Sequence, residues 1–492
     1  METNKSSIKQ GTYALACRCC LALLASFAFA LPLQAQDVPP TFFGGIQVNE
    51  PDHDGWVAAL ADAGLDSVQV TLYARQQRWD GSTLYWEREA PWVVSEIRSA
   101  KRAGLRVMLV MRVALEHGLA ANRHLWHGMI WPRDDELQAW FDRYTEFVLW
   151  GAALAAREDV DLFVVGNELN SLSSTTAAVA LPHLYAYFLD SDSVRAVRSD
   201  LVRCAATTPG NSLTYLDGGR PADLESFLLD EERVRRAWTL QALEGSSGSL
   251  VKLNARRARY EAFWRKLVAQ VRGRYSGLVS YGANFDQFAE VGFWDALDFV
   301  AVNAYFPLSV YGLEAEGRVA RMDSAWRRIA AELAEAGNAR PVVLIELGWT
   351  RRLGSTVRPY SYDRVEVLET AGAEGARTCV HWESQPDDAG ERVAALQALA
   401  DVVHDGGFTT LRGFTLWKLT TRDEHRAIEP FAALLQPGSG YGHVGWQALA
   451  SSQQDELDAA YVGLAAAIGR EVRSRSARWH NSGKFNLGDR QE

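Results

Sequence analysis

The stretch FFGGIQVNEPDHDG, Phe42 to Gly55, distinguishes between two folds that the rest of the chain allows. A short apolar strand is followed by a segment with helical spacing, and such strand–helix pairs recur along the chain. An open doubly wound sheet predicts a glycine-rich loop, GxGxxG, directly after its first strand. Here the glycine pair lies at the start of the strand and no such loop follows. The stretch therefore favours a closed barrel.

Seven further apolar runs predict strands at 66–73, 105–113, 160–167, 277–284, 297–306, 340–349 and 411–419. Helical patterns lie between them, at 52–64, 90–104, 134–157, 256–274, 318–337 and 390–404, with a last one at 453–472. The strand runs are continuously apolar, as expected of parallel strands that are covered on both faces. Alternating strands and helices indicate a parallel sheet, and eight units of this length fit an α/β fold of the (β/α)8 TIM-barrel type.

One segment interrupts this order, between the fourth strand and its helix. Residues 171–256 read as a helical insertion with two or three helices. A loop that follows a barrel strand leaves at the face where active sites lie, so we expect the insertion to wall or cover the site. A decoration of the surface is the alternative. The remaining chain from 36 to 473 is expected to form one catalytic domain, followed by a flexible polar tail at 474–492.

Residues 1–35 have the pattern of an export signal. A positively charged start precedes the apolar run 19–33, which is short for a membrane span, and Ala35 offers a cleavage position before Gln36. We expect a periplasmic or secreted bacterial protein with no stable membrane association after cleavage. Leu33, three places before the cut, makes the signal imperfect, so an uncleaved anchor stays open.

Composition narrows the partners of the chain. Its 492 residues carry 51 Lys and Arg against 61 Asp and Glu, with no basic run, so no nucleic-acid partner is expected. After the leader, the absence of CxxC pairs and His/Cys clusters argues against a structural zinc site. Cys204 and Cys379 remain after the leader is removed, either as a disulfide or as two thiols. Oligomeric state is left open.

Polar side chains stand where the predicted strands end: Gln47, Asn49, Arg112, Asn167, Glu168, Asn170, Tyr281, Asn284, Asn303, Tyr305, Glu346, Trp349, Trp417 and Lys418. In a barrel these strand ends form the active-site face. Glu168 on the fourth strand and Glu346 on the seventh would face each other across the barrel mouth. Two such carboxyls cleave glycosidic bonds, while amides bind sugar hydroxyls and aromatic rings stack on sugar rings. Taken singly, either glutamate fits a helix cap or an ion pair, Glu346 with Arg112.

Several of these motifs resemble a known family. GNE (166–168) and IELG (345–348) resemble the retaining glycoside hydrolases of clan A. The block Trp264 to Ser309 is similar to the central part of glycoside hydrolase family 113, the β-mannanase family. RPVVLIELGWT (340–350) is similar to that family's nucleophile strand, and GFTLWKL (413–419) to its last strand. The resemblance spans roughly 42 to 449, apart from the insertion.

The resemblance implies a role for each matching position and no cofactor or metal. Glu168 matches the acid/base and Glu346 the nucleophile. The substrate-binding positions that it implies are Asn167 at the sugar 2-hydroxyl, Tyr305 beside the nucleophile, Trp417 as the floor under the sugar, and also Arg112, Asn284 and Trp382. Acid catalysis then requires a raised pKa at Glu168, while Tyr305 and Arg112 would keep Glu346 ionised.

We therefore expect a retaining β-glycoside hydrolase that cleaves a β-mannan-like polysaccharide or oligosaccharide by double displacement, with endo-β-1,4-mannanase as a candidate activity. An enzyme that trims or transglycosylates exopolysaccharide is an alternative, motivated by the large insertion. A glycan-binding barrel without catalysis is another. Linkage and endo or exo action are left open.

Overall fold

The structure is a computed structural model, and it describes residues 42–175, 200–203, 224–246, 250–313, 315–360, 364–372, 375–383, 385–386, 388, 390–422, 424–425, 429, 431–435 and 444–445. It describes no side chains within 200–203, 224–229, 243–250, 315–316, 364–383 and 444–445. The predicted export signal, last helix and polar tail lie outside the described residues, as do Cys204 and the side chain of Cys379. These expectations stay predictions.

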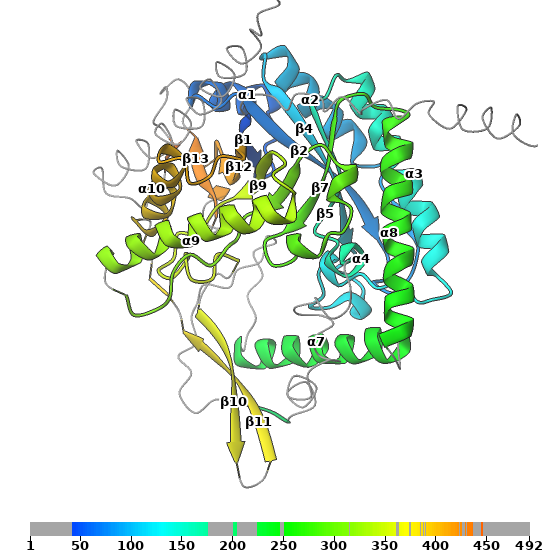
Figure 1. The fold of residues 1–492 in the computed structure, drawn as a ribbon, viewed down its shortest axis with the longest axis vertical. Helices are drawn as coiled ribbons and strands as arrows, with labels where there is room; N and C mark the ends of the chain where they lie inside the picture. Colours follow the sequence, from blue (N-terminus) through cyan, green and yellow to red (C-terminus); the bar gives the residue numbers. More distant parts are fainter. Residues whose placement is uncertain are drawn as a thin grey trace, which may run out of the picture. The chain divides into compact units, whose positions relative to one another are not determined.

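Eight parallel strands form a closed barrel, which confirms the predicted fold class (Figure 1). The strands, in barrel order, are β1 (Phe42–Gln47), β2 (Ser67–Gln76), β4 (Arg106–Leu115), β5 (Leu162–Asn167), β7 (Leu278–Asn284), β8 (Val300–Asn303), β9 (Val342–Leu347) and β12 (Leu411–Thr420). Parallel pairing of β1 with β12 closes the ring. Each predicted strand overlaps one of these eight, because its apolar run is buried on both sides.

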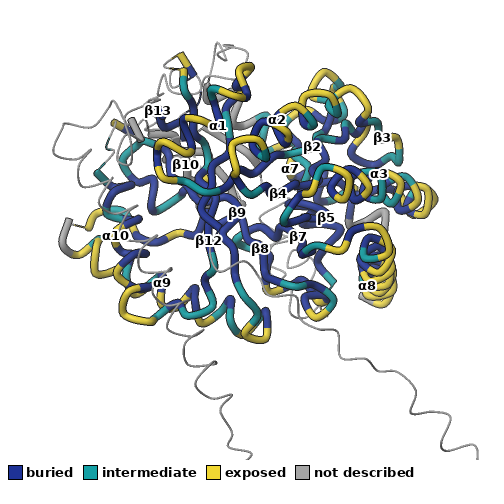
Figure 2. The backbone as a smooth tube through the Cα atoms, turned by 90° about the horizontal axis from the view of Figure 1, so that it is seen from above, coloured by how far each residue is buried: buried dark blue, intermediate teal, exposed yellow. Residues whose placement is uncertain are grey.

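Helices surround the barrel: α1 (His53–Asp62), α2 (Ala90–Arg102), α3 (Leu137–Arg157), α8 (Leu250–Arg272), α9 (Ala315–Ala336) and α10 (Gly390–His404). Figure 2 shows the strands buried at the centre, with exposed positions concentrated on the outer sides of the helices. Two 3-10 turns, η4 (Phe288–Glu290) and η5 (Trp294–Ala296), connect β7 to β8 in place of a helix. No helix among the described residues is long and apolar enough to cross a bilayer.

The core has two layers, which explains why the strand runs are apolar without alternation. One layer fills the barrel and consists of Phe42, Met108, Val110, Leu162, Val164, Leu278, Phe299, Ala301, Val343 and Ile345. A larger cluster packs between the strands and the helices. Successive residues of a strand point to opposite faces, so neighbours such as Met108 and Leu109 enter different layers and both must be apolar.

The segment after β5 differs in part from the predicted insertion. Its described parts are α4 (Asn170–Ser173), β6 (Asp200–Arg203) and α7 (Leu224–Ser246), and helix α8 begins at Leu250 instead of at 256. Two or three helices were expected there. The described residues include one long helix and a strand that was not expected, so the helical character of the whole insertion stays a prediction.

A second, small sheet was also missed by the sequence interpretation. Strands β10 (Arg364–Gly372) and β11 (Gly375–Glu383) form an antiparallel hairpin between β9 and α10, and β6 pairs in parallel with β11. Helix α7 contacts both β6 and β11 and lies beside the hairpin in Figure 1. Two chain segments inserted after different barrel strands therefore meet in one substructure. Smaller pairings join β3 (Leu84–Tyr85) to β2, β13 (Ala433–Leu435) to β12, and β14 (Val444–Gly445) to β13.

Candidate active site

Two buried glutamates face each other at the carboxyl ends of the barrel strands. Glu346 belongs to β9, and Glu168 follows β5 directly. Their exposed fractions are 1% and 6%. Arg112 of β4 lies between them: its Nη1 donates to Glu346 Oε1 at 2.8 Å, and its Nη2 donates to Glu168 Oε2. One guanidinium reaches both carboxylates, so the two predicted residues share one site.

Hydrogen bonds hold the carboxylate of Glu346 in one orientation. The hydroxyl of Tyr305 donates to Oε2 at 2.8 Å, and Nδ2 of Asn167 lies 3.2 Å from Oε1. Asn303 in turn donates to the amide oxygen of Asn167 at 3.1 Å, which fixes which way that amide points. Three of these residues come from three different strands, so only barrel closure brings them together.

Glu168 has a strained backbone. Its φ of 52° lies in the left-handed region, which costs a non-glycine residue about 1–3 kcal/mol. Its N–H donates to the carbonyl of Gly282 at 2.8 Å, and the next N–H, that of Leu169, donates to the hydroxyl of Tyr281 at 2.9 Å. Both donors of the turn are thus satisfied by β7. The turn is held in the one conformation that leaves the carboxylate in contact with Arg112.

Glycines allow the close packing of these strand ends. A Cβ on Gly282 would lie 2.2 Å from Oδ1 of Asn167, and a Cβ on Gly348 would lie 2.1 Å from the carbonyl oxygen of Trp417. Any side chain at either position would displace a site residue or separate β9 from β12. This explains physically why glycine stands in the ELGW motif.

The other predicted site residues differ in how close they lie to Arg112 and the two carboxylates. The guanidinium carbon of Arg112 lies 5.6 Å from the ring centre of Trp417, and Nζ of Lys418 lies 4.4 Å from the same ring. The peptide bond between Trp417 and Lys418 is cis. Asn284 ends β7, and its side-chain oxygen accepts from the N–H of Phe285 at 3.0 Å. The side chain of Trp382, on β11, lies outside the described residues.

His127 is a site residue that the sequence interpretation missed. It lies in η2 (His127–Met129), and its Nε2 is 2.8 Å from Glu168 Oε2 and 3.3 Å from Arg112 Nη2. A search of strand ends could not find it, because it lies twelve positions after Leu115, the last residue of β4. Its sequence neighbourhood carries no motif that would have separated it from the other histidines.

The charges of the site give its two carboxyls different proton affinities. Burial favours the neutral form of Glu168, but the charge of Arg112 and the hydrogen bond with His127 outweigh burial and lower its pKa to about 2. Burial dominates at Glu346 and, with the charge of Glu168 adding to it and Arg112 opposing it, raises its pKa to about 7. Burial and Arg112 lower the pKa of His127, so its ring is neutral near pH 7.

This pattern is the reverse of the one expected from the sequence, in which Glu168 held the proton. At Glu168 the contact with His127, which was not foreseen, adds to that with Arg112. In the unliganded site the two carboxyls share one proton, because burial, their mutual repulsion and Arg112 act on both. Across the described residues, no group of three or more His, Cys, Asp or Glu side chains is arranged to hold a metal.

The site lies within the parts of the chain that match a known family. The family model for Glycoside Hydrolase Family 113 matches residues 48–178 and 250–375, and these ranges contain both glutamates and Arg112. The chain belongs to glycoside hydrolase family 113, and it is an O-glycoside hydrolase. The unmatched gap, 179–249, falls within the segment predicted as an insertion.

Solved structures are similar to the chain at low sequence identity. A GH113 β-1,4-mannanase complex is 17% identical, with 89% of this chain and 99% of that chain covered and a TM-score of 0.48. The GH113 β-mannanase of Alicyclobacillus acidocaldarius is 17% identical, with coverage of 86% and 97% and a TM-score of 0.49. A GH5_18 protein of Bifidobacterium longum is 14% identical, with coverage of 90% and 80% and a TM-score of 0.39. No curated protein matches the sequence.

Proposed function

We propose that this glycoside hydrolase cleaves β-mannan-like polysaccharides or oligosaccharides with retention of configuration. Glu346 acts as the nucleophile and Glu168 as the acid/base. The observation that carries the proposal is the bridge formed by Arg112, which contacts both buried carboxylates. Retaining glycosidases need carboxyls about 5–5.5 Å apart, and a pair shared by one guanidinium is consistent with that separation. β-Mannan is the substrate class that the resemblance to the β-mannanase family implies.

Substrate binding must first move the shared proton. The glycosidic oxygen is an acceptor, so its arrival at Glu168 favours the protonated carboxyl there. A sugar hydroxyl that donates to Glu346 favours the ionised form of that carboxylate, in addition to the bonds from Tyr305 and Asn167. Both effects transfer the proton from Glu346 to Glu168. The site is then ready for nucleophilic attack with Trp417 beside the bound ring.

The reaction then proceeds in two chemical steps. The Glu346 carboxylate attacks the anomeric carbon while the glycosidic C–O bond breaks, and Glu168 gives its proton to the departing oxygen. Glu346 is now a neutral ester, so Arg112 stabilises the ionised Glu168 alone. Glu168 then takes a proton from water, whose oxygen bonds to the anomeric carbon while the ester C–O bond breaks. Both carboxyls regain their starting state.

The test is substitution of the nucleophile. Glu346→Ala removes the attacking oxygen, and we expect hydrolysis of β-mannan to fall by at least about 10⁴-fold, with sodium azide restoring turnover as an α-glycosyl azide. Glu146→Ala, an exposed glutamate of α3, is the matched control and should retain full activity. Wild-type turnover by the Glu346→Ala protein, with its fold verified by circular dichroism, would disprove the assignment.

We also propose that the chain is exported, which rests on the charged start, apolar run and Ala35 of its first 35 residues. Expression of the full chain in a bacterium, followed by fractionation and N-terminal sequencing, should find a mature protein that begins at Gln36 in the periplasm or medium. An intact N-terminus in the membrane fraction would show an uncleaved anchor instead.

A further inference from the structure

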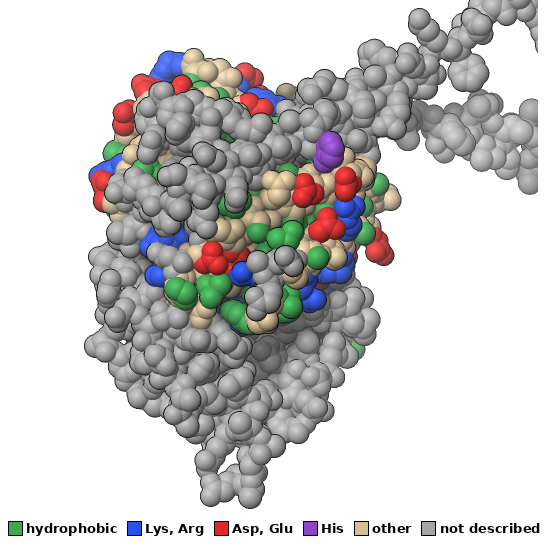
Figure 3. Space-filling model, turned by 90° about the vertical axis from the view of Figure 1, so that its left-hand side faces the viewer, with side chains coloured by type: hydrophobic (Ala, Val, Ile, Leu, Met, Phe, Trp, Pro, Cys, Tyr) green, Lys and Arg blue, Asp and Glu red, His purple; other side chains and the backbone are tan. Residues whose placement is uncertain are grey.

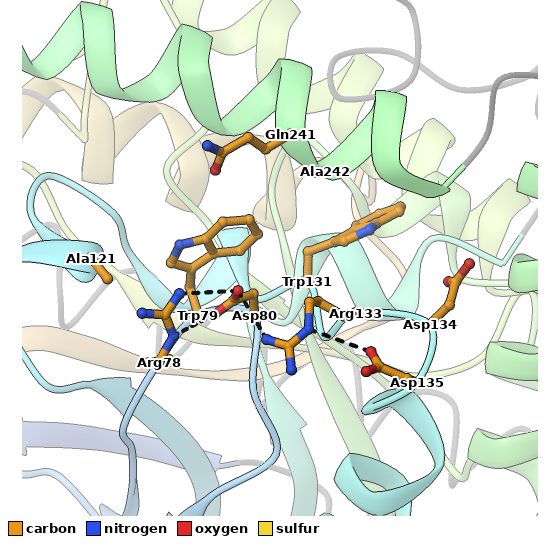
Figure 4. A pocket seen from close by; sticks show the side chains of 10 residues that line it. All are labelled: Arg78, Trp79, Asp80, Ala121, Trp131, Arg133, Asp134, Asp135, Gln241 and Ala242. Carbon is orange, nitrogen blue, oxygen red and sulfur yellow. Dashed lines mark hydrogen bonds and ion pairs between the residues drawn. The ribbon is translucent and has the colours of Figure 1, made fainter.

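A second pocket lies outside the catalytic pair. Its volume is about 700 Å³, and it is formed by the loop after β2, the loop after β4 and helix α7. Figure 4 shows Trp79 and Trp131 rising from the two loops, with Gln241 and Ala242 of α7 on the opposite side. Helix α7 falls in the range 179–249 that the family model leaves unmatched. The pocket therefore combines family elements with a wall that is particular to this chain.

The pocket is close to the catalytic site along the chain. His127, which contacts Glu168, and Trp131, which lines the pocket, are four residues apart. An extended chain rises at most about 3.6 Å per residue, so their Cα atoms lie within about 14 Å of each other. A polysaccharide bound at the catalytic pair can reach this pocket with sugar units of the same chain.

Helix α7 contacts both of the loops that line the pocket. Trp238 donates its indole N–H to the carbonyl of Met129 at 2.8 Å, and its ring meets that of Trp79 edge to face at 6.3 Å. Trp238 is 2% exposed, so this contact is a buried anchor. Buried contacts thus hold in place the wall that α7 contributes to the pocket.

The charged side chains around the pocket compensate each other. Asp80 pairs with Arg78 at 2.9 Å and with Arg133 at 3.2 Å, Asp135 lies 3.4 Å from Arg133, and Asp134 pairs with the guanidinium of Arg256. Three carboxylates thus meet three guanidinium groups, and no net charge is left to attract an ionic ligand. On the face shown in Figure 3, described basic and acidic side chains are likewise interspersed.

Paired carboxylates and guanidinium groups at a pocket still offer free lone pairs and N–H donors to sugar hydroxyls. Trp79 and Trp131, 8% and 2% exposed, form the apolar floor under these polar groups. The exposed amide of Gln241 provides both a donor and an acceptor. A neutral polyhydroxylated ligand fits this set of groups better than a phosphate or an acidic polymer.

We propose that this pocket, between α7 and the loops after β2 and β4, binds neutral sugar units of a long substrate at a distance from the cleaved bond. The inference rests on the proposed function for its substrate class, and adds that the chain prefers long polysaccharides over short ones. Contacts with remote sugars add to the binding energy of a long substrate, whereas a short substrate does not reach them.

Two variants test the pocket without touching the catalytic residues. Ala121→Trp places a large ring into the pocket, and Gln241→Ala removes the amide of α7. We expect the KM for a soluble β-mannan to rise about 10-fold for Ala121→Trp and about 5-fold for Gln241→Ala, as expected for one or two lost contacts. Activity on an aryl β-mannoside should stay unchanged. Gln138→Ala, on the exposed face of α3, is the control.

Equal effects on the long and the short substrate, or no effect on either, would overturn the proposal. Affinity electrophoresis in gels that contain β-mannan, glucomannan or acidic polygalacturonate tests the pocket without catalysis. Retardation by a neutral polysaccharide that both variants weaken supports the pocket, and retardation by polygalacturonate alone overturns it. If the wild type bound a neutral polysaccharide through the pocket but hydrolysed none, the proposed function would fail and the pocket would stand.

Discussion

At the scale of single residues, Arg112 determines the protonation of the two buried carboxyls in the active site. Burying two carboxylates without a cation would be strongly unfavourable, because ions lose their hydration and repel each other. A single guanidinium that contacts both keeps one ionised and leaves the other with a raised pKa. The site therefore carries one exchangeable proton near neutral pH, as general acid catalysis needs.

The same proton predicts the pH dependence of activity. As pH rises through about 7, to which burial raises the pKa of Glu346, the pair loses its proton and the site has no general acid. We expect kcat/KM on β-mannan to fall tenfold per pH unit above this value. A profile that stays level to pH 9 would contradict the shared-proton model.

Substitution of His127 tests which contact keeps Glu168 ionised. His127→Phe removes the ring N–H at 2.8 Å from the carboxylate, so the ionised form of Glu168 loses a donor and its pKa rises. We expect the alkaline limb of the kcat/KM profile to move to higher pH, while the wild-type limb stays near 7. His404→Phe, at the end of α10 and far along the chain, is the control. An unmoved limb in His127→Phe would show that Arg112 alone sets the charge state.

At the scale of elements, helix α2 carries a buried carboxyl that links stability to pH. Glu96 is 3% exposed, and burial raises its pKa to about 7, with the negative charge of Glu50 adding to the rise. A raised folded-state pKa means that the folded protein binds the proton more tightly than the unfolded chain. This stabilisation is complete below about pH 4.5 and is lost as pH rises through about 7.

The corresponding variant is Glu96→Gln, which keeps the shape and stays neutral. A shift of the pKa from 4.5 to about 7 corresponds to about 3 kcal/mol of unfolding free energy between these pH values. We expect the Tm of the wild type to fall between pH 5 and pH 8 and that of Glu96→Gln to fall less. Parallel curves in differential scanning calorimetry would show that Glu96 is ionised in the folded state at both pH values.

Elements differ in how far the sequence reveals them. Barrel strands and their helices were predicted because burial on both faces leaves a continuous apolar run. The β10–β11 hairpin was missed, although the run from Arg364 to Glu383 contains a glycine-flanked turn at 372–375. Its pairing with β6 joins segments from two different insertions. A local sequence pattern does not show which distant strand pairs with the hairpin. The hairpin and its partner strand β6 were therefore both missed.

At the scale of the whole molecule, barrel closure depends on the seam between the first and the last strand. Gly413 of β12 is paired with Phe42 of β1, and a Cβ at 413 would lie 2.0 Å from the carbonyl oxygen of Phe42. Because the neighbour is backbone, relief requires the two strands to move apart. No side-chain rotation can provide the space.

We therefore expect Gly413→Ala to reduce the free energy of unfolding by about 1–3 kcal/mol, as overpacking does elsewhere, and to lower the Tm by several degrees. Gly317→Ala in α9 is the matched control: a Cβ there meets open space, and alanine favours helix by about 0.5–1 kcal/mol. Thermal unfolding of both variants by circular dichroism is the measurement. Equal Tm values for the two would contradict a closed seam.

The barrel follows from the sequence alone, because the apolar runs and their spacing require parallel strands covered on both faces. It also located Glu168 and Glu346, since each directly follows or ends such a run, and polar residues at strand ends meet on one face of a barrel. These inferences depend only on period and order along the chain.

The side chains that surround Glu168 and the wall of the second pocket can be seen only in the folded chain. His127 reaches Glu168 from a 3-10 turn twelve positions beyond the end of β4, and α7 meets the loops of β2 and β4 from another part of the chain. The physical reason is that a pKa depends on every charge and donor within a few ångströms, whatever its position in sequence. Such neighbours are set by folding, so the contact with His127 that helps to lower the pKa of Glu168 was not expected from the sequence.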